Sequence, residues 1–105
     1  ARAFGFDHYR VRGALMKHPS RIIIDLLEWE EPRGLAVSRQ ALNDVGIARI
    51  ALITEDLDAD IQTLRQHGVE LVSEQSAEAR GPRGSPVRFI CFRDPDGNTL
   101  ELVQM

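Results

Sequence analysis

The segment Phe92-Arg-Asp-Pro-Asp-Gly-Asn-Thr-Leu-Glu-Leu102 decides the fold, because it holds the end of one strand, a tight turn and the start of the next strand. Pro95 suits the second position of a turn, and Gly97 tolerates the positive φ that such a turn requires. Val87–Arg93, before the turn, alternates and is aromatic, and Thr99–Met105 follows it. The pattern predicts a β-hairpin.

The residues upstream of this hairpin predict a strand, a helix and a further strand. Ile47–Thr54 is a β-branched apolar run, typical of a buried strand. Asp56 stands where a helix N-cap is expected, and Gly68 where the helix would end. Val69–Ser73 predicts a short strand, and Glu74–Pro86, with its prolines and glycines, predicts a surface loop. The second half is therefore expected to be β-α-β-β-β.

A second hairpin is predicted in the first half, from His8–Lys17 and Arg21–Trp29. Shifting the chain by 76 positions superimposes it on the hairpin at the C-terminal end without a gap. The matched positions include Val11 with Val87, Pro19 with Pro95, and Ile24-Asp25-Leu26 with Leu100-Glu101-Leu102. A match over roughly 19 positions indicates an internal repeat, and chance agreement between two amphipathic hairpins is the alternative.

The repeat also predicts how the domain is organised. Residues 1–31 would be the last hairpin of a first module, 32–45 a linker, and 46–105 a complete second module, all within one domain. The first module would lack its initial strand-helix-strand, which we expect about 30 residues before Ala1 in a protein of about 140 residues.

Composition excludes several classes of function. The 105 residues suit one domain, and 43% hydrophobic with 28% charged residues is typical of a globular protein. A net charge of -3 offers no basic face for nucleic acid, and no apolar run is long enough to span a membrane. Cys91, the single cysteine, allows no intrachain disulfide, so we expect a cytoplasmic protein.

Several stretches together resemble the vicinal oxygen chelate superfamily, which includes glyoxalase I, bleomycin resistance proteins, extradiol dioxygenases and methylmalonyl-CoA epimerase. The stretches similar to its second module are Asn43-Asp-Val-Gly-Ile-Ala-Arg-Ile-Ala-Leu52, Asp56-Leu-Asp-Ala59, Leu64-Arg65, Gly68-Val69 and Phe92–Leu102. Asp25–Trp29, followed by Pro32, looks like the last strand of the first module. The resemblance implies an α+β fold of paired β-α-β-β-β modules, whose mixed sheets form a cupped cavity that often holds a divalent metal.

The resemblance also implies where metal ligands would lie. Glu101 matches the last-strand carboxylate of the second module, and Asp25 takes the equivalent place in the first. Arg49 stands where a first-strand histidine is expected, and the remaining ligand would lie before Ala1. A guanidinium has no lone pair to give a metal. If a site forms, Mn, Fe, Ni or Zn would suit carboxylate and imidazole ligands.

Strand alternation leaves three interpretations of Arg49 open. If Ile50 and Leu52 pack under the helix, Arg49 and Glu101 point to the other face of the sheet. Arg49 then forms a structural ion pair with Glu101 or Asp25, binds an anionic ligand, or stands beside a rearranged metal site. The first two interpretations need no cofactor.

Other side chains are weaker candidates. Trp29 and Phe92 are candidate ligand-binding residues, although aromatic residues at strand spacing are more often part of a core. Cys91 is expected to be a buried, inert thiol. His18, aligned with Asp94 by the repeat, is expected to stabilise its turn rather than bind a metal.

Two functions follow from the resemblance. One is an enzyme acting on a small molecule between the modules, a lyase, isomerase or dioxygenase in which a metal acts as Lewis acid and Glu101 moves a proton. The other is a metal-free binding or sequestration protein of the resistance type, with Arg49 recognising an anionic ligand. A structural module that pairs with a partner is a third, and we expect a homodimer.

Overall fold

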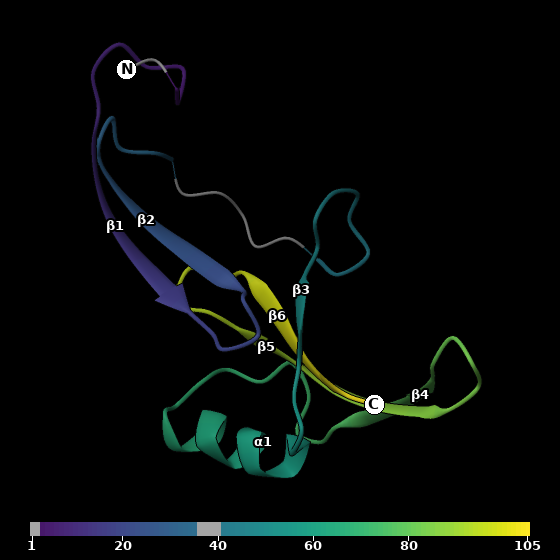
Figure 1. Ribbon diagram of the computed structural model, residues 1–105. Coiled ribbons are helices and arrows are strands. Elements are labelled where there is room, and N and C mark those ends of the chain that lie inside the picture. Colours follow the sequence, from purple (N-terminus) through teal and green to yellow (C-terminus); the bar gives the residue numbers. More distant parts are fainter. Residues whose placement is uncertain (1–2, 36–40) are drawn as a thin grey trace. The chain divides into compact units, whose positions relative to one another are not determined.

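The computed structural model describes residues 3–35 and 41–105, which belong to two compact units. The first unit is Ala1–Val37 and the second is Ser38–Met105. Figure 1 labels their helix and strands. In the described part of the chain, no helix is long and apolar enough to cross a membrane.

The first unit is an antiparallel hairpin of β1 (Arg10–Lys17) and β2 (Ile23–Glu31). The prediction of two strands around Pro19 is confirmed, and β2 extends two residues beyond the expected end. Its apolar side chains are largely exposed, as at Leu15 and Ile23. Two strands alone bury little surface, so the pairing of backbone groups contributes most of the order in this unit.

The second unit contains β3 (Ile50–Ile53), α1 (Leu57–Gln66), β4 (Ala77–Arg80), β5 (Pro86–Arg93) and β6 (Thr99–Gln104). Its four strands lie in the order β3-β6-β5-β4, with β3 parallel to β6 and the other pairs antiparallel. This is the predicted β-α-β-β-β sequence in a mixed sheet, and the α+β class is confirmed.

One strand of this unit was predicted in the wrong place. Val69–Ser73 contributes only an isolated bridge between Leu71 and Phe92. The strand β4 instead lies inside the predicted loop and pairs with the outer edge of β5. Its sequence, Ala-Glu-Ala-Arg, has low intrinsic β propensity. The edge of β5 and the turn in which Gly81 donates to Ser85 O place it there.

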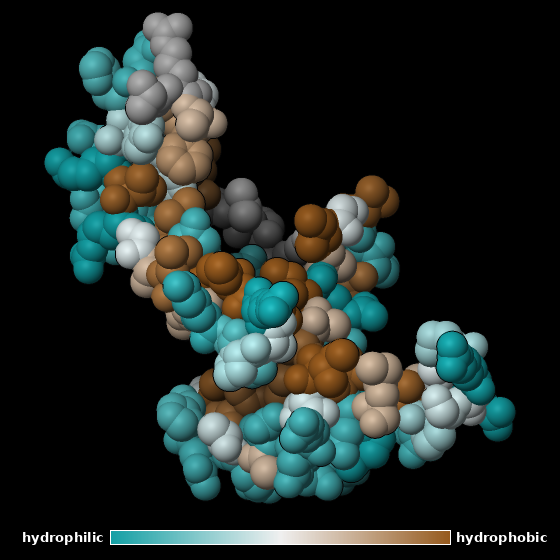
Figure 2. Space-filling view, in the orientation of Figure 1, coloured by the Kyte–Doolittle hydropathy of each residue, from teal (hydrophilic) through white to brown (hydrophobic). Residues whose placement is uncertain are grey.

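The helix α1 covers one face of the sheet. Asp56 is the N-cap, as predicted, and accepts a hydrogen bond from the Ala59 amide. Leu57 and Ile61 are buried against Ile90, with Leu71 and Leu102 packed around them. Figure 2 shows that the outward side of α1, at the bottom of the view, is mostly hydrophilic. An amphipathic helix of this kind has one face that it can bury against a sheet.

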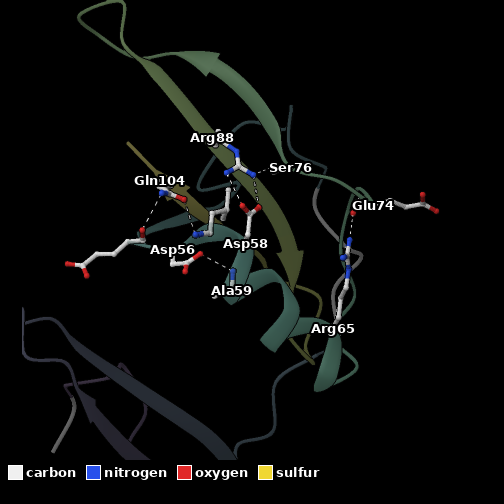
Figure 3. Close-up of polar contacts among 10 residues, drawn as sticks. Asp56, Asp58, Ala59, Arg65, Glu74, Ser76, Arg88 and Gln104 are labelled. Carbon is white, nitrogen blue, oxygen red and sulfur yellow. Dashed lines mark hydrogen bonds and ion pairs between the residues drawn. The ribbon is translucent and has the colours of Figure 1, made fainter.

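Side chains from β5 and β6 hold the N-terminal end of α1 (Figure 3). Gln104 Oε1 accepts from the Leu57 amide at 2.9 Å. Arg88 contacts Asp58 through both terminal nitrogens, at 2.7 and 3.3 Å, and also donates to Ser76. The first turn of a helix has amides without intrahelical partners, and the Gln104 side chain satisfies one of them.

The two hairpins have the same pairing register when the chain is shifted by 76 positions. Leu15 lies opposite Asp25 in β1–β2, and the equivalent residues Cys91 and Glu101 lie opposite each other in β5–β6. The turns also agree: the His18 amide donates to Ile22 O, as the Asp94 amide donates to Asn98 O. The internal repeat is therefore structural as well as sequential.

His18 stabilises its turn, as predicted. Its Nδ1 atom accepts from the Ser20 amide at 3.2 Å, and in the second hairpin Asp94 Oδ1 accepts from the Asp96 amide at 3.0 Å. An imidazole nitrogen and a carboxylate oxygen thus occupy equivalent acceptor positions.

Candidate functional site

The candidate site lies on the face of the sheet opposite α1. Glu101 is in β6, beside Ala51 of β3 on one side and Cys91 of β5 on the other. Its chain neighbour Leu102 packs against the helix, so alternation directs Glu101 to the opposite face. The expectation that Leu102 packs under the helix is confirmed.

Arg49 forms an ion pair with Glu101 on this face. Its Nε atom is 2.8 Å from Glu101 Oε2. The Glu101 side chain is 9% exposed, whereas that of Arg49 is 48% exposed. A buried carboxylate requires a partner, and Arg49 supplies the compensating positive charge. Of the three interpretations that the sequence left open for Arg49, the structure contains the contact of the first, an ion pair, with Glu101 as the partner.

The thiol of Cys91 contacts the same oxygen atom, Glu101 Oε2. Its Sγ atom donates to Glu101 Oε2 at 3.5 Å. Burial raises the pKa of the Cys91 thiol, and the hydrogen bond and negative charge of Glu101 raise it further, while Arg49 and Arg93 oppose this. A raised pKa keeps the sulfur protonated at neutral pH, which suits a donor and not a nucleophile.

Arg93 is a second arginine on this face, and the sequence reasoning missed it. Its Nη1 atom donates to Thr99 Oγ1 at 2.7 Å, and Thr99 lies opposite it in the register. Thr99 itself is 5% exposed. The available signal was alternation, because Arg93 is two residues after Cys91 and so shares its face.

The other sequence candidates lie elsewhere. Phe92 alternates to the same side as Ile90, opposite the face of Arg49, because it follows Cys91 directly in the strand. Asp25 and Trp29 belong to β2 of the first unit. Their roles as ligand or pocket residues stay predictions.

Trp29 is surrounded by aromatic rings that the sequence analysis did not connect. Its ring centroid is 5.3 Å from Phe4 and 5.5 Å from Phe6, both in edge-to-face geometry, and 6.0 Å from Tyr9. Such arrangements stabilise beyond simple burial. The density of aromatic residues between positions 4 and 9 was the signal for this group.

The donor groups around Glu101 do not fit a divalent metal. Within residues 3–35 and 41–105, no group of three or more His, Cys, Asp or Glu side chains is placed to hold one. The Oε2 atom of Glu101 already contacts a guanidinium. A fixed positive charge at that distance repels a cation, and Arg49 cannot be a ligand itself.

These observations define an α+β protein whose β-α-β-β-β unit has its buried apolar core on the helix-covered face and the Arg49–Glu101 ion pair on the opposite face. The family model described as Glyoxalase/Bleomycin resistance protein/Dioxygenase superfamily matches residues 5–102. The chain therefore belongs to this superfamily, and the resemblance inferred from the sequence is confirmed.

Two solved structures with a TM-score of 0.50 or more show the same fold. A glyoxalase family protein from Bacillus cereus has a TM-score of 0.81 at 27% identity, over 98% of this chain and 67% of that one. A virulence protein from Salmonella typhimurium has a TM-score of 0.50 at 21% identity, over 88% and 76%. Methylmalonyl-CoA epimerase from Mycobacterium tuberculosis is 32% identical over 90% and 62%, with a TM-score of 0.46. A search of the curated proteins finds no match to the chain.

Proposed function

We propose that this protein binds a small anionic molecule through Arg49, without a metal ion at Glu101. The observation that carries the proposal is the 2.8 Å contact between Arg49 Nε and the buried Glu101 Oε2. It uses one edge of the guanidinium and holds the side chain in place. Among the described residues, Glu101 is the group that contacts this guanidinium, so its terminal nitrogens remain available to a ligand.

An anion is the expected ligand because of the chemistry of arginine. A guanidinium presents several N–H donors in a plane and binds carboxylate or phosphate with two parallel hydrogen bonds. The ion pair with Glu101 reduces the conformational entropy that Arg49 would lose on binding. Membership of the superfamily supports a small molecule as the ligand.

A catalytic function remains a further proposal. Lyase, isomerase or dioxygenase activity, with Glu101 moving a proton, would require the substrate to displace or rearrange the contact with Arg49. A metal held by Glu101 and Asp25 would require the same change. The ion pair favours binding over metal chemistry at this position.

The test measures binding of acetate and inorganic phosphate by calorimetry at constant ionic strength. Arg49→Gln combined with Glu101→Gln removes both partners, which avoids leaving a buried charge unpaired, and should weaken binding about ten-fold or more. Arg80→Ala is the matched control, because Arg80 is an exposed arginine of β4 outside this site. Equal affinities in wild type and the double variant would contradict the proposal.

A second measurement addresses the metal directly. The protein is loaded with Mn, Fe, Ni or Zn and dialysed exhaustively, and the bound metal is counted. We expect no retained ion. Retention of about one ion per chain, lost in Glu101→Ala, would show a metal site and overturn the metal-free proposal.

We also propose that the protein is a homodimer in the cytoplasm. The exposed apolar side chains of the β1–β2 hairpin, including Leu15, Ile23 and Leu26, support an association that would cover them. The unpaired Cys91 is compatible with a reducing compartment. Light scattering during size-exclusion chromatography, at several protein concentrations, would give the mass of the species in solution.

A further inference from the structure

Two arginines lie at the ends of one row across the second unit, with Arg49 directly before β3 and Arg93 in β5. Ile50 of β3 lies beside Leu100 of β6, so extending this register by one residue places Arg49 beside Thr99. Thr99 in turn lies opposite Arg93 of β5. Neighbouring strands are about 4.8 Å apart, so the backbones at Arg49 and Arg93 are about 10 Å apart on the same face. Their long side chains can reach a common ligand.

The charges of the two arginines and their neighbours on this face are not balanced. Arg49 has a carboxylate partner in Glu101, whereas the contacts of Arg93 are to the Thr99 hydroxyl and, at 3.5 Å, to the Gly97 carbonyl oxygen. Both of these acceptors are uncharged. The four groups Arg49, Arg93, Glu101 and the protonated Cys91 therefore carry one net positive charge.

Both guanidiniums are also held in position. Glu101, two residues after Thr99 in β6, holds Arg49 through the ion pair. The buried Thr99 accepts from Arg93 Nη1 at 2.7 Å. Because a side chain that is already ordered loses less entropy on binding, fixed arginines bind more tightly than mobile ones.

We propose that Arg49 and Arg93 bind the ligand together, and that this ligand carries two negative charges, as a phosphate group or a dicarboxylate does. The inference rests on the proposed function of Arg49 and specifies the class of ligand. A dianion carries one negative charge for each guanidinium, whereas a monoanion has a single charge to share between the two.

The experiment compares acetate, succinate and inorganic phosphate in calorimetry at constant ionic strength and about pH 8, where phosphate is mainly a dianion. Wild-type protein should bind at least one of the two dianions about ten-fold more tightly than acetate. Arg93→Gln should remove this preference, because it should weaken binding of the dianion more than binding of acetate. Arg80→Ala should behave as wild type. Which dianion binds more tightly distinguishes a phosphate from a dicarboxylate ligand.

Thr99→Val provides a second test, because it keeps the shape of a buried residue while releasing Arg93 from its acceptor. Circular dichroism and the thermal midpoint check that each variant is folded. If Arg93→Gln does not fold, Thr99→Val should still lower the preference for dianions. A preference that survives in a folded variant, or is absent from wild type, would overturn the inference. Acetate binding that depends on Arg49 would leave the proposed function intact, whereas no anion binding at all would remove both.

Discussion

Glu101 Oε2 has two partners: it forms an ion pair with Arg49 Nε at 2.8 Å and accepts a hydrogen bond from Cys91 Sγ at 3.5 Å. One is charged and half-exposed, and the other is neutral and buried. The arginine compensates the negative charge of the carboxylate, and the thiol donates a hydrogen bond without adding charge. A charged residue is therefore tolerated in the middle of a sheet because its partners come from both sides, Cys91 from β5 and Arg49 from the residue directly before β3.

The raised pKa of Cys91 predicts a loss of stability at alkaline pH. The folded state binds the thiol proton more tightly than the unfolded state, whose pKa is near the ordinary value of 9.0. This contribution is complete below that pH and is lost as the pH rises towards the higher folded pKa. Denaturant unfolding at a series of pH values should show a steeper alkaline decline in wild type than in Cys91→Ala. Parallel declines would contradict the assignment.

The equivalent turns predict opposite effects on stability when glycine is removed from one and introduced into the other. Arg21 has φ of 70° and Gly97 has φ of 87° at matching positions. A side chain at positive φ costs about 1–2 kcal/mol, so Gly97→Ala should destabilise by that amount. Arg21→Gly should stabilise by less than about 1 kcal/mol, because glycine also gains entropy in the unfolded chain.

Two probes can follow the two turns separately. Trp29 is the only tryptophan and lies in β2, so its fluorescence reports on the first hairpin, while circular dichroism of α1 reports on the second unit. A gain in stability from Gly97→Ala, or a loss from Arg21→Gly, would show that backbone conformation is not the controlling effect.

At the scale of an element, α1 is positioned both by a neighbouring residue and by residues that are distant in the sequence. The N-cap is local, from Asp56, but Gln104 contacts Leu57 across 47 positions and Arg88 contacts Asp58 across 30. The local cap predicts where the helix starts. The distant contacts determine which strands it lies against.

The Asp58–Arg88 pair predicts a stability effect that depends on pH. The hydrogen bond and the charge of Arg88 lower the pKa of Asp58 below its ordinary value of 3.8. A lowered folded pKa contributes stability above that pH, which is lost as the pH falls through the folded pKa. Asp58→Asn should lower the thermal midpoint slightly at neutral pH, and the difference should vanish in strong acid. The effect is small because the pair is exposed.

Glu74→Gln is the matched control for this prediction. Glu74 is an exposed carboxylate whose backbone oxygen accepts from Arg65 Nη2, so the substitution leaves that bond in place. A pH-independent effect of Asp58→Asn would mean that its charge does not act through Arg88.

At the scale of the molecule, the two units differ in how they are stabilised. The second has a buried cluster around Leu57, Ile61 and Ile90, whereas the first has a half-exposed aromatic group beside a hairpin with exposed apolar residues. Burial of apolar surface is the main stabilising contribution to folding. The second unit therefore has a buried apolar core of its own.

This difference predicts the behaviour of separate fragments. Residues 41–105 should unfold cooperatively on heating, followed by circular dichroism, and residues 3–35 should show no cooperative transition, because an isolated hairpin is marginal in water. An uncooperative transition of the longer fragment would show that its core requires the first unit.

Much of the fold was predictable because its signals are local. The turn at Asp94-Pro-Asp-Gly-Asn98, the N-cap Asp56 and the shift of 76 positions all depend on short segments, and the structure contains each of them. The strand β4 was not predictable, because its residues have little preference for a strand and pair only where β5 offers an edge.

The sequence by itself determined the two hairpins, their common register, the helix and the expectation that Arg49 and Glu101 share a face. Only the tertiary structure decided that Arg49 contacts Glu101, that Cys91 donates to the same oxygen and that Arg93 donates to Thr99 on the same face. The physical reason is the separation along the sequence over which each interaction acts. Turns, caps and alternation act over a few residues, whereas this site forms from three strands whose order follows from long-range pairing and burial.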